Sequence, residues 1–405
     1  MAGSPKKTKA KDIFKRCYEY TKPDEYRSLG LYPYFTAFSG YVGESPMVML
    51  NGRQALMFGS NNYLGLTTHP KVKEASIEAI RKYGTGCSGS RMLNGTLDIH
   101  IKLEEELADF TGKEATLLFS TGFMTNGCLS ALLSRDEFAI LDKSVHASII
   151  YGTMATFSKN HRRFKHNDMN DLGAILEALP PEKGKLVVVD GVFSMEGDIT
   201  DLPAIVREAK AHGARVMVDD AHGIGVLGQG GRGTAEHFGL EQDVDLIMGT
   251  YSKSLAAIGG FIVGAADVIN YVRHVGRSMI FSASLPPSLV ATVSTALDII
   301  EEQPQLRERL WKNTRKMLDG YKKLGYDTGH SETPIIPIII KDGIKVYEMC
   351  RHLFEEGVFV NPVVSPAVPP GRELLRTSCM ATHTEEQLDK VLDAFARVGK
   401  KLGVI

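Results

Sequence analysis

Short runs of β-branched and other apolar residues alternate with amphipathic segments through the middle of the chain. Six such runs occupy residues 115–120, 137–142, 185–190, 214–219, 245–249 and 259–264. Between them lie segments such as LDIHIKLEEELADF (97–110) and LPAIVREAKAHG (202–213), in which apolar residues recur at helical spacing. This alternation predicts an α/β domain with a largely parallel sheet, because parallel strands need crossover connections that are usually helical.

The pattern changes after FSASLPPS at residues 281–288, where long helices continue to about residue 325. The apolar runs PIIPIIIK, GVFVNPV and LLRTSC follow, and a last helix is expected from about Thr384. A chain of 405 residues exceeds what one hydrophobic core normally holds. We therefore expect a tail and a segment packing on the small domain (1–60), a large ligand-binding domain (61–290) and a smaller C-terminal α+β domain (291–405).

Composition excludes some functions. The net charge of −1 provides no field for binding nucleic acid. Five scattered cysteines without a C-x-x-C pair or metal-ligand spacing fit reduced thiols in packing positions, although Cys87 lies among glycines and is a candidate for exposure. No apolar run reaches the roughly 18 residues of a membrane span, and the N-terminus lacks the apolar stretch of a signal peptide. The expected location is cytoplasmic.

One charge run stands out near the N-terminus. The stretch SPKKTKAKDIFKR, residues 4–16, has five lysines and one arginine against one aspartate. It is interpreted as a polar tail, and weak peripheral attraction to anionic lipid is the second interpretation.

Polar residues follow four of the predicted strands. In parallel α/β sheets, ligands bind at the carboxyl ends of the strands. The residues at these ends are Asp190, Ser194 and Glu196; Asp219 and His222; His146; and Thr250, Ser252 and Lys253. Because we expect these residues to meet at one edge of the sheet, a functional site explains them better than a role in packing.

The segment GIGVLG (223–228) also matches the glycine pattern of a dinucleotide-binding oxidoreductase. The residues that follow, QGGRG, do not open a helix, so no helix N-terminus is expected for a pyrophosphate. The acidic residues some twenty positions further on begin a strand instead of ending one. This alternative is therefore disfavoured.

A lysine, an aspartate, hydroxyls and an imidazole together match the needs of pyridoxal phosphate. This cofactor needs a lysine amine for a Schiff base and an acid at its pyridinium nitrogen. Lys253 and Asp219 are placed for these tasks, and His146 offers a flat partner for the ring. Thr250, Ser252 and the turn at residues 120–123 offer donors for the phosphate.

With these residues in view, nearly the whole chain resembles the α-oxoamine synthases, a family of fold-type-I (aspartate-aminotransferase-like) pyridoxal-phosphate transferases. The likeness runs through these motifs: FGSNNYLGLTTHPKV, GTGCSGSRMLNGT, HIKLEEELADFTG, FSTGF, HASI, GVFSMEGDI, VDDAHGIGVLG, GTYSKSLAAIGGF, FSASLPPS and LLRTSC. The resemblance implies an enzyme that joins an amino acid to an acyl-CoA with loss of CO2.

Family roles on matching positions make Lys253 the residue that holds the cofactor and later acts as base. Asp219 would face the ring nitrogen and His146 would stack on the ring. The other implied cofactor contacts are His222 and Ser194 beside the phenolic oxygen, and Thr250, Ser252, Gly122 and Phe123 at the phosphate.

Two further pairs are implied by the resemblance. Ser282 and Ala283 resemble the segment that reaches the phosphate of the partner subunit, which implies an obligate homodimer with shared active sites. Asn62 and Arg376 resemble the pair that grips the amino acid's carboxylate, a task suited to the arginine fork. A turn asparagine and a rim arginine are the alternatives, and Asn61 is an alternative to Asn62.

Ser252, directly before the lysine, resembles the serine palmitoyltransferase branch, whereas Tyr251 and Asn61 depart from its pattern. That branch implies condensation of L-serine with a long-chain acyl-CoA such as palmitoyl-CoA to 3-ketosphinganine, the first step of sphingolipid synthesis. Alternatives are glycine C-acetyltransferase, 8-amino-7-oxononanoate synthase, an aminotransferase of the same fold, and a cofactor-free scaffold. The sequence leaves the acyl chain length and the choice among serine, glycine and alanine open.

Overall fold

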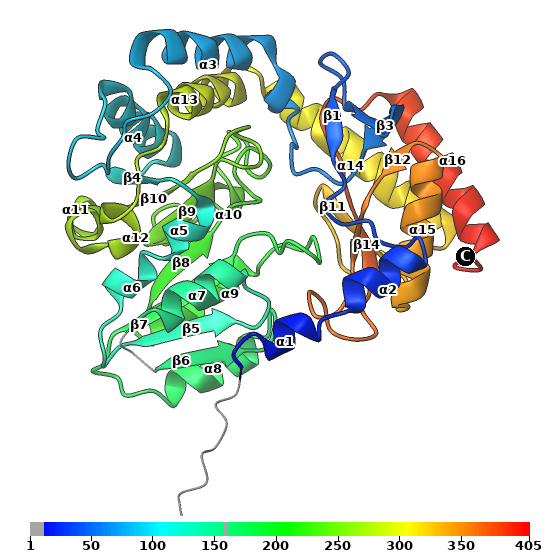
Figure 1. Ribbon diagram of the computed structural model, residues 1–405. Helices are drawn as coiled ribbons and strands as arrows, with labels where there is room; N and C mark the ends of the chain where they lie inside the picture. The colour runs from blue at the N-terminus through cyan, green and yellow to red at the C-terminus, as the bar shows by residue number, and fades with distance from the viewer. Residues whose placement is uncertain (1–11, 157–159) are drawn as a thin grey trace, which may run out of the picture.

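A computed structural model describes residues 12–156 and 160–405 and places a seven-stranded sheet at the centre of the larger part of the molecule (Figure 1). Its strands, in spatial order, are β4 (Ala115–Phe119), β10 (Gly260–Gly264), β9 (Leu246–Thr250), β8 (Arg215–Asp219), β7 (Lys185–Asp190), β5 (Phe138–Asp142) and β6 (His161–Phe164). Strand β10 runs antiparallel to both of its neighbours, and every other pairing is parallel. The largely parallel sheet predicted from the sequence is confirmed.

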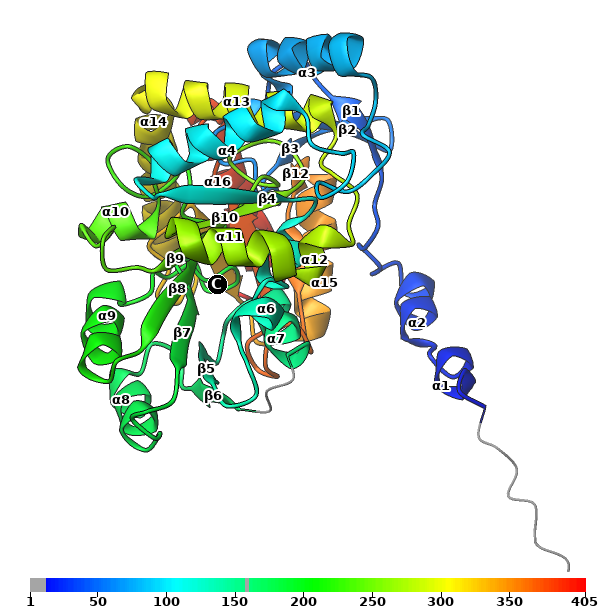
Figure 2. The ribbon, with the colours of Figure 1, turned by 90° about the vertical axis from the view of Figure 1, so that its left-hand side faces the viewer.

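Helices cover both faces of this sheet, which explains why its strands are apolar throughout. In β7, Val187 and Val189 pack into one core, and Leu186 and Val188 pack into the other. The first face carries α4 (Asp98–Thr111), α8 (Met169–Glu177), α9 (Leu202–Ala211) and α10 (Thr234–Phe238). The second carries α5 (Gly122–Asn126), α6 (Leu129–Leu132), α7 (Ala147–Met154), α11 (Ala266–Val275) and α12 (Arg277–Ile280). Figure 2 shows α9 and α7 on opposite sides of strands β7 and β8.

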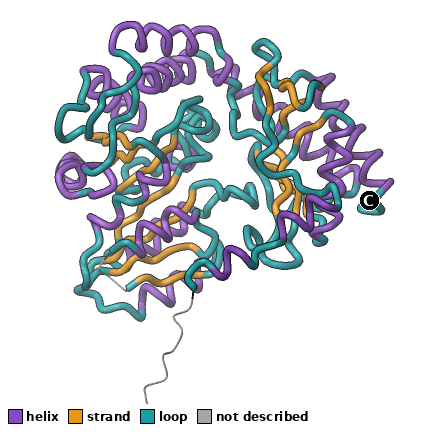
Figure 3. The backbone as a smooth tube through the Cα atoms, in the orientation of Figure 1, coloured by secondary structure: helices purple, strands orange, loops and turns teal. Residues whose placement is uncertain are grey.

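The smaller part is built on two sheets (Figure 3). The antiparallel one has the order β11 (Ile335–Ile339), β14 (Leu374–Ser378) and β13 (Asn361–Val363). The other has the order β1 (Phe38–Tyr41), β2 (Met47–Leu50), β3 (Arg53–Met57) and β12 (Val358–Phe359). Helices α14 (Pro304–Leu324), α15 (Gly343–Glu355) and α16 (Glu385–Lys401) accompany them. Thr384 caps α16 and forms a capping box with Gln387, which explains where this helix begins.

The remaining helices connect these parts. They are α1 (Lys15–Tyr18), α2 (Lys22–Ser28), the short 3-10 helix η1 (Leu66–Thr68), α3 (Pro70–Tyr83) and α13 (Pro287–Glu302). Helix α13 packs on α3 and α4 and contains residue 290, while β12 pairs with β3. The domain boundaries at residues 60 and 290 stay predictions.

Some elements were not predicted. Strand β6, with the sequence HRRF, lies at the sheet edge with three exposed residues, so it lacks the apolar pattern of a buried strand. Residues 1–11, which hold most of the basic run at residues 4–16, lie outside the described residues, and its contact with lipid stays a prediction. Among the described helices, none is both long and apolar enough to cross a bilayer.

Candidate active site

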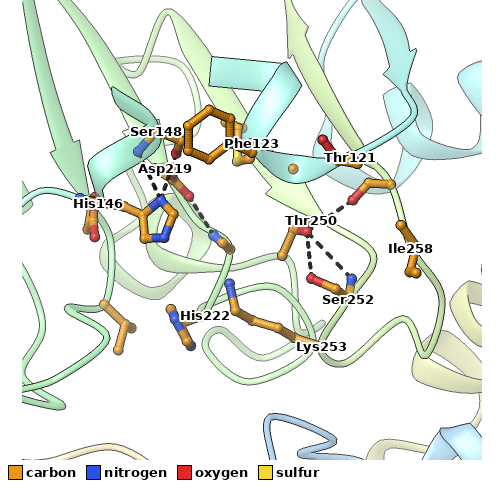
Figure 4. A pocket seen from close by; sticks show the side chains of 16 residues that line it. Thr121, Phe123, His146, Ser148, Asp219, His222, Thr250, Ser252, Lys253 and Ile258 are labelled. Carbon is orange, nitrogen blue, oxygen red and sulfur yellow. Dashed lines mark hydrogen bonds between the residues drawn. The ribbon is translucent and has the colours of Figure 1, made fainter. Parts of the chain in front are cut away.

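A cavity of about 340 Å³ lies where the carboxyl ends of the sheet strands meet (Figure 4). Eight of the predicted site residues line it: Gly122, Phe123, His146, Asp219, His222, Thr250, Ser252 and Lys253. Strands β5, β7, β8 and β9 end at Asp142, Asp190, Asp219 and Thr250, and the loops that follow them carry most of the remaining polar groups. Seven of the nine side chains expected at this sheet edge therefore line the cavity, with Asp190 among them. The other two, Ser194 and Glu196, line a neighbouring cavity that shares His146 with the first.

Lys253 follows β9 and extends into this cavity (Figure 4). Burial lowers the pKa of its amine to about 8, and the charge of Arg376 also lowers it, while the charges of Asp219 and Asp190 act in the opposite direction. An amine with a pKa near 8 is about one tenth neutral at pH 7, far more than an ordinary lysine, and its neutral form can act as a nucleophile or base.

Asp219, at the end of β8, is held in place by two donors. The side-chain amide of Asn126 donates to one carboxylate oxygen at 2.7 Å, and the backbone N–H of Ala221 donates to the other at 3.1 Å. Asn126 Nδ2 also lies 2.8 Å from the Ser148 hydroxyl, so one residue of α5 connects Asp219 to α7. The nearly fully buried carboxylate is therefore fixed by one side-chain donor and one backbone donor.

His146 precedes α7, and its ring faces the open cavity. Its Nδ1 lies 2.6 Å from the hydroxyl of Ser148, and its backbone N–H donates to Asp190 at 3.2 Å. Partial burial lowers the pKa of His146, so the ring is mostly neutral at neutral pH. Burial and the charge of Asp219 raise the pKa of Asp190 well above its usual range.

His222 follows β8 on the same side of the cavity as Lys253 (Figure 4). Burial and the nearby charges of Lys253 and Arg376 lower its pKa well below the usual value. Its Nδ1 lies 2.7 Å from the hydroxyl of Tyr63, whose pKa burial raises to about 12. Both partners are therefore neutral, and the pair shares a hydrogen bond without carrying charge.

The other end of the cavity is built from hydroxyls and a close backbone approach. Thr250 Oγ1 lies 3.0 Å from Ser252 Oγ, and Thr121 caps the first turn of α5 by accepting from the Met124 N–H. A Cβ on Gly122 would lie 2.6 Å from Thr250 Oγ1, so glycine is required for this approach. Small hydroxyl donors beside free backbone N–H groups are typical of phosphate sites.

Five predicted residues do not line this cavity. Arg376 is buried in β14, where its Nε donates to the Ser194 carbonyl at 2.7 Å, and its charge acts on Lys253 and His222. Asn62 Oδ1 accepts from the Thr67 N–H at 3.3 Å, as a turn asparagine does.

Ser282 and Ala283 line a separate small cavity beside Ser120. The Ser282 hydroxyl donates to the Ser278 carbonyl at 2.7 Å, and the Ser120 hydroxyl donates to the carbonyl of Ala283.

Sequence reasoning missed the residues that orient the predicted ones. Asn126, Ser148 and Tyr63 hold Asp219, His146 and His222, respectively. Ser148 and Tyr63 lie within motifs already noted, HASI and FGSNNYLGL, but no spacing rule pointed to Asn126 on the five-residue helix α5. Asn61 Oδ1 accepts from the Tyr63 hydroxyl at 3.3 Å, which places Asn61 near His222.

The donor set of this cavity fits pyridoxal phosphate. It offers one amine of lowered pKa, one anchored carboxylate, one flat neutral ring, and hydroxyls beside a backbone turn. Within residues 12–156 and 160–405, no group of three or more His, Cys, Asp or Glu side chains is arranged to hold a metal ion.

Comparisons with known proteins agree with the family that the sequence motifs indicate. The sequence matches the family Aminotransferase class I and II over residues 53–395. It is 50% identical to a serine palmitoyltransferase of Sphingobacterium spiritivorum, covering 96% of this chain and 97% of that protein. It is 42% identical to an 8-amino-7-oxononanoate synthase of Thermoanaerobacter pseudethanolicus, covering 95% and 97%.

A solved structure extends the likeness to three dimensions. A serine palmitoyltransferase variant from S. paucimobilis with a bound PLP–myriocin aldimine superposes with a TM-score of 0.94 at 38% identity, covering 98% of this chain and all of that one. The strands, the cavity and the matched sequence are therefore those of one family. The chain belongs to the aminotransferase class I and II family, in its α-oxoamine synthase branch.

Proposed function

We propose that the protein condenses L-serine with a long-chain acyl-CoA, releasing CoA and CO2 and forming 3-ketosphinganine. The observation that carries this proposal is the 50% identity, over 96% of the chain, to a protein named serine palmitoyltransferase. The cavity with Lys253, Asp219 and His146 supports the pyridoxal-phosphate chemistry that such a condensation needs.

Pyridoxal phosphate bound in this cavity supplies an electron sink for the carbanion at the amino-acid Cα. Lys253 would hold the cofactor, and its free amine would take the Cα proton of the amino acid, because an amine with a pKa near 8 is an effective base at neutral pH. Asp219, fixed by Asn126, would keep the ring nitrogen protonated, and His146 would face the ring. Thr250, Ser252 and the backbone of Gly122 and Phe123 would hold the phosphate, and His222 would lie near the phenolic oxygen. Ser194, the other residue proposed for the phenolic oxygen, lines the neighbouring cavity.

Arg376 would bind the carboxylate of the amino acid until the bond between Cα and the carboxylate breaks and CO2 leaves. Its side chain is buried, and the Ser194 carbonyl and the Ser378 hydroxyl fix two of its nitrogens, at 2.7 and 3.0 Å. A pre-oriented guanidinium suits bidentate recognition of a carboxylate. Asn62 is the predicted second contact and Asn61 is the alternative. The oxygen of each side chain accepts one hydrogen bond at 3.3 Å, Asn62 from the Thr67 N–H and Asn61 from the Tyr63 hydroxyl, so these bonds do not separate the two.

The active enzyme is a homodimer in which Ser282 and Ala283 reach the phosphate of the partner subunit. Large apolar side chains exposed near this segment and on the N-terminal arm support an interface between copies, since such patches mark contacts. Phe281 is 76% exposed and Phe14 is 55% exposed, and α1 and α2 project from the body of the chain in Figure 2.

A second candidate function is 8-amino-7-oxononanoate synthase or glycine C-acetyltransferase activity, which would use the same residues. The 42% identity to an 8-amino-7-oxononanoate synthase favours keeping it. The two candidates differ in the amino acid and in the acyl group, not in the cofactor chemistry.

A product assay separates these candidates. Purified protein loaded with cofactor is given serine, glycine or alanine, each crossed with acetyl-, pimeloyl- and palmitoyl-CoA, and CoA release and products are measured by mass spectrometry. We expect 3-ketosphinganine from serine and palmitoyl-CoA at the highest rate. Faster turnover of glycine with acetyl-CoA, or of alanine with pimeloyl-CoA, would assign the protein to the second candidate.

A further inference from the structure

His166 lies outside the catalytic cavity and bridges two acidic residues from different segments. Its Nδ1 lies 3.1 Å from Asp142 Oδ1, and its Nε2 lies 2.9 Å from Asp198 Oδ2. Asp142 ends β5 and is fully buried, and its oxygens also accept the backbone N–H groups of Ser144 and Asn167. One end of the bridge is therefore anchored to the central sheet.

The imidazole makes both contacts as a cation. Both ring nitrogens donate only when the ring is protonated, and both partners are carboxylates. Burial alone would lower the pKa of His166, but the hydrogen bonds and charges of Asp142 and Asp198 raise it to about 10. The other Asp198 oxygen, Oδ1, is buried without a hydrogen bond among the described residues. The positive charge of His166 therefore compensates for the burial of this carboxylate.

Asp198 closes a tight loop formed by residues 192–199. Its carbonyl accepts from the Phe193 N–H at 3.1 Å, and Val192 and Ile199 form an isolated bridge at the base of the loop. The ring of Phe193 meets the His166 ring edge-on at 4.3 Å. The bridge and the ring contact together fix where this loop lies.

The loop in turn contacts the smaller part of the molecule. The Gly197 carbonyl accepts from the Thr333 hydroxyl at 2.8 Å, and a Cβ at Gly197 would lie 2.1 Å from the Ile335 carbonyl. The Ser194 carbonyl accepts from Arg376 Nε at 2.7 Å. The loop therefore sets the position of the buried guanidinium.

We propose that His166 is a positioning residue: held between Asp142 and Asp198, it locks the 192–199 loop so that the Ser194 carbonyl orients Arg376 toward the substrate carboxylate. The inference rests on the proposed function, because it takes Arg376 as the carboxylate-binding residue. His166 itself contacts neither cofactor nor substrate.

The test compares His166→Gln with Lys165→Ala, which changes the neighbouring exposed residue, whose ion pair with Asp171 (3.9 Å) lies apart from the loop. We expect His166→Gln to raise KM for serine about tenfold, the loss typical of a broken charged hydrogen bond, with kcat and KM for palmitoyl-CoA nearly unchanged. Lys165→Ala should behave as wild type. Equal losses in every constant, or no change in a folded His166→Gln protein, would overturn the proposal.

A double-mutant cycle shows whether His166 acts through Arg376. In an Arg376→Lys background, His166→Gln should add little to KM for serine, because the residue it positions is already altered. A full additive increase would contradict the proposal. If thermal unfolding shows that His166→Gln does not fold, Asp198→Asn is measured instead, because it keeps a hydrogen-bond acceptor and removes the charge. This variant should raise KM for serine to a smaller extent. An unchanged KM for serine would overturn the proposal.

Failure of the proposed function gives a different result. If the wild-type protein prefers glycine or alanine, the assignment of serine as the substrate is wrong. The test of His166 then uses KM for the preferred amino acid. All three share the carboxylate, so the split between KM and kcat still decides the role of His166.

Discussion

At the scale of single residues, burial sets the chemistry of the cavity. Burial lowers the pKa values of Lys253, His146 and His222 together, so that all three lose their charge more readily than they would at a surface. A neutral amine beside neutral rings is suited to nucleophilic and base chemistry. Arg376 then remains the one strong cation whose charge acts on both Lys253 and His222 among the described residues.

The lowered pKa of Lys253 predicts how the cofactor-free protein captures pyridoxal phosphate. Only the neutral amine attacks, so the capture rate should rise with pH through about 8. At pH 8 an ordinary lysine is under about 1% neutral, whereas Lys253 is about half neutral. Stopped-flow absorbance at a series of pH values measures this profile.

The control for this capture is Lys253→Ala, which should acquire no cofactor that borohydride can fix. In the wild-type protein, peptide mapping after borohydride should place the label on the peptide with Lys253. A label on another lysine, or a rate that still rises above pH 10, would contradict the assignment.

Replacement of Arg376 by lysine should weaken amino-acid binding. A point charge cannot keep the contacts to the Ser194 carbonyl and the Ser378 hydroxyl and also bind a carboxylate with two parallel hydrogen bonds. We expect KM for serine to rise about tenfold or more. Arg372→Lys, on an exposed loop, is the matched control. Unchanged serine affinity in Arg376→Lys would make Arg376 a structural residue.

At the scale of elements, strand ends and short helices position these groups. The turn between β4 and α5 brings Gly122 against Thr250 and places Asn126 against Asp219, although the strands β4 and β9 are separated by β10 in the sheet. Helix α5 has five residues, so its role is to deliver these groups and not to bury a large apolar face.

Gly122→Ala should lower the affinity for pyridoxal phosphate. The added Cβ would lie 2.6 Å from Thr250 Oγ1, so Thr250 or the turn must shift away from the phosphate position. Overpacking of this kind costs about 1–3 kcal/mol, or about five- to 150-fold in affinity.

The matched control is Gly86→Ala, where the added Cβ would meet no atom within 4 Å. Cofactor affinity is measured for both variants by equilibrium titration after removal of the bound cofactor. An unchanged dissociation constant in Gly122→Ala would show that the turn does not hold the phosphate.

At the scale of the whole molecule, a single chain supplies all the residues that line the catalytic cavity, whereas Ser282 lies outside this cavity. Ala283, next to it, is exposed, and Ser282 follows the exposed Phe281. The proposed shared-site homodimer would account for this arrangement, because a second copy would both cover the apolar side chain of Phe281 and receive the Ser282 hydroxyl.

Mixed dimers test the shared site. Lys253→Ala removes the base, and Ser282→Asp places like charge beside the phosphate, so each homodimer should be nearly inactive. In a heterodimer of the two variants, one site receives both changes and the other receives neither. Separately tagged and doubly purified heterodimers should therefore regain about half of the activity of a wild-type control, by this count of intact sites. Heterodimers that stay inactive would exclude the exchange of Ser282 between subunits.

Much of the fold and of the site could be predicted from local patterns in the sequence. Apolar runs such as KLVVVD, alternating with helical periodicity, determined the parallel sheet, because strands covered on both faces must be apolar at every position. Polar residues directly after those runs determined that Asp219, His146 and Lys253 would meet, since parallel strands present their carboxyl ends at one edge.

Features that depend on contacts between residues far apart in the sequence were decided by the tertiary structure alone. Strand β6 is exposed and basic, so only its pairing with β5 reveals it. The partners Asn126 for Asp219 and Tyr63 for His222 are 93 and 159 residues away, and no periodicity encodes such a separation. The lowered pKa of Lys253 likewise arises from the protein packed around it. Local sequence determines which chemical groups a strand end carries, whereas their orientation and charge depend on the folded surroundings.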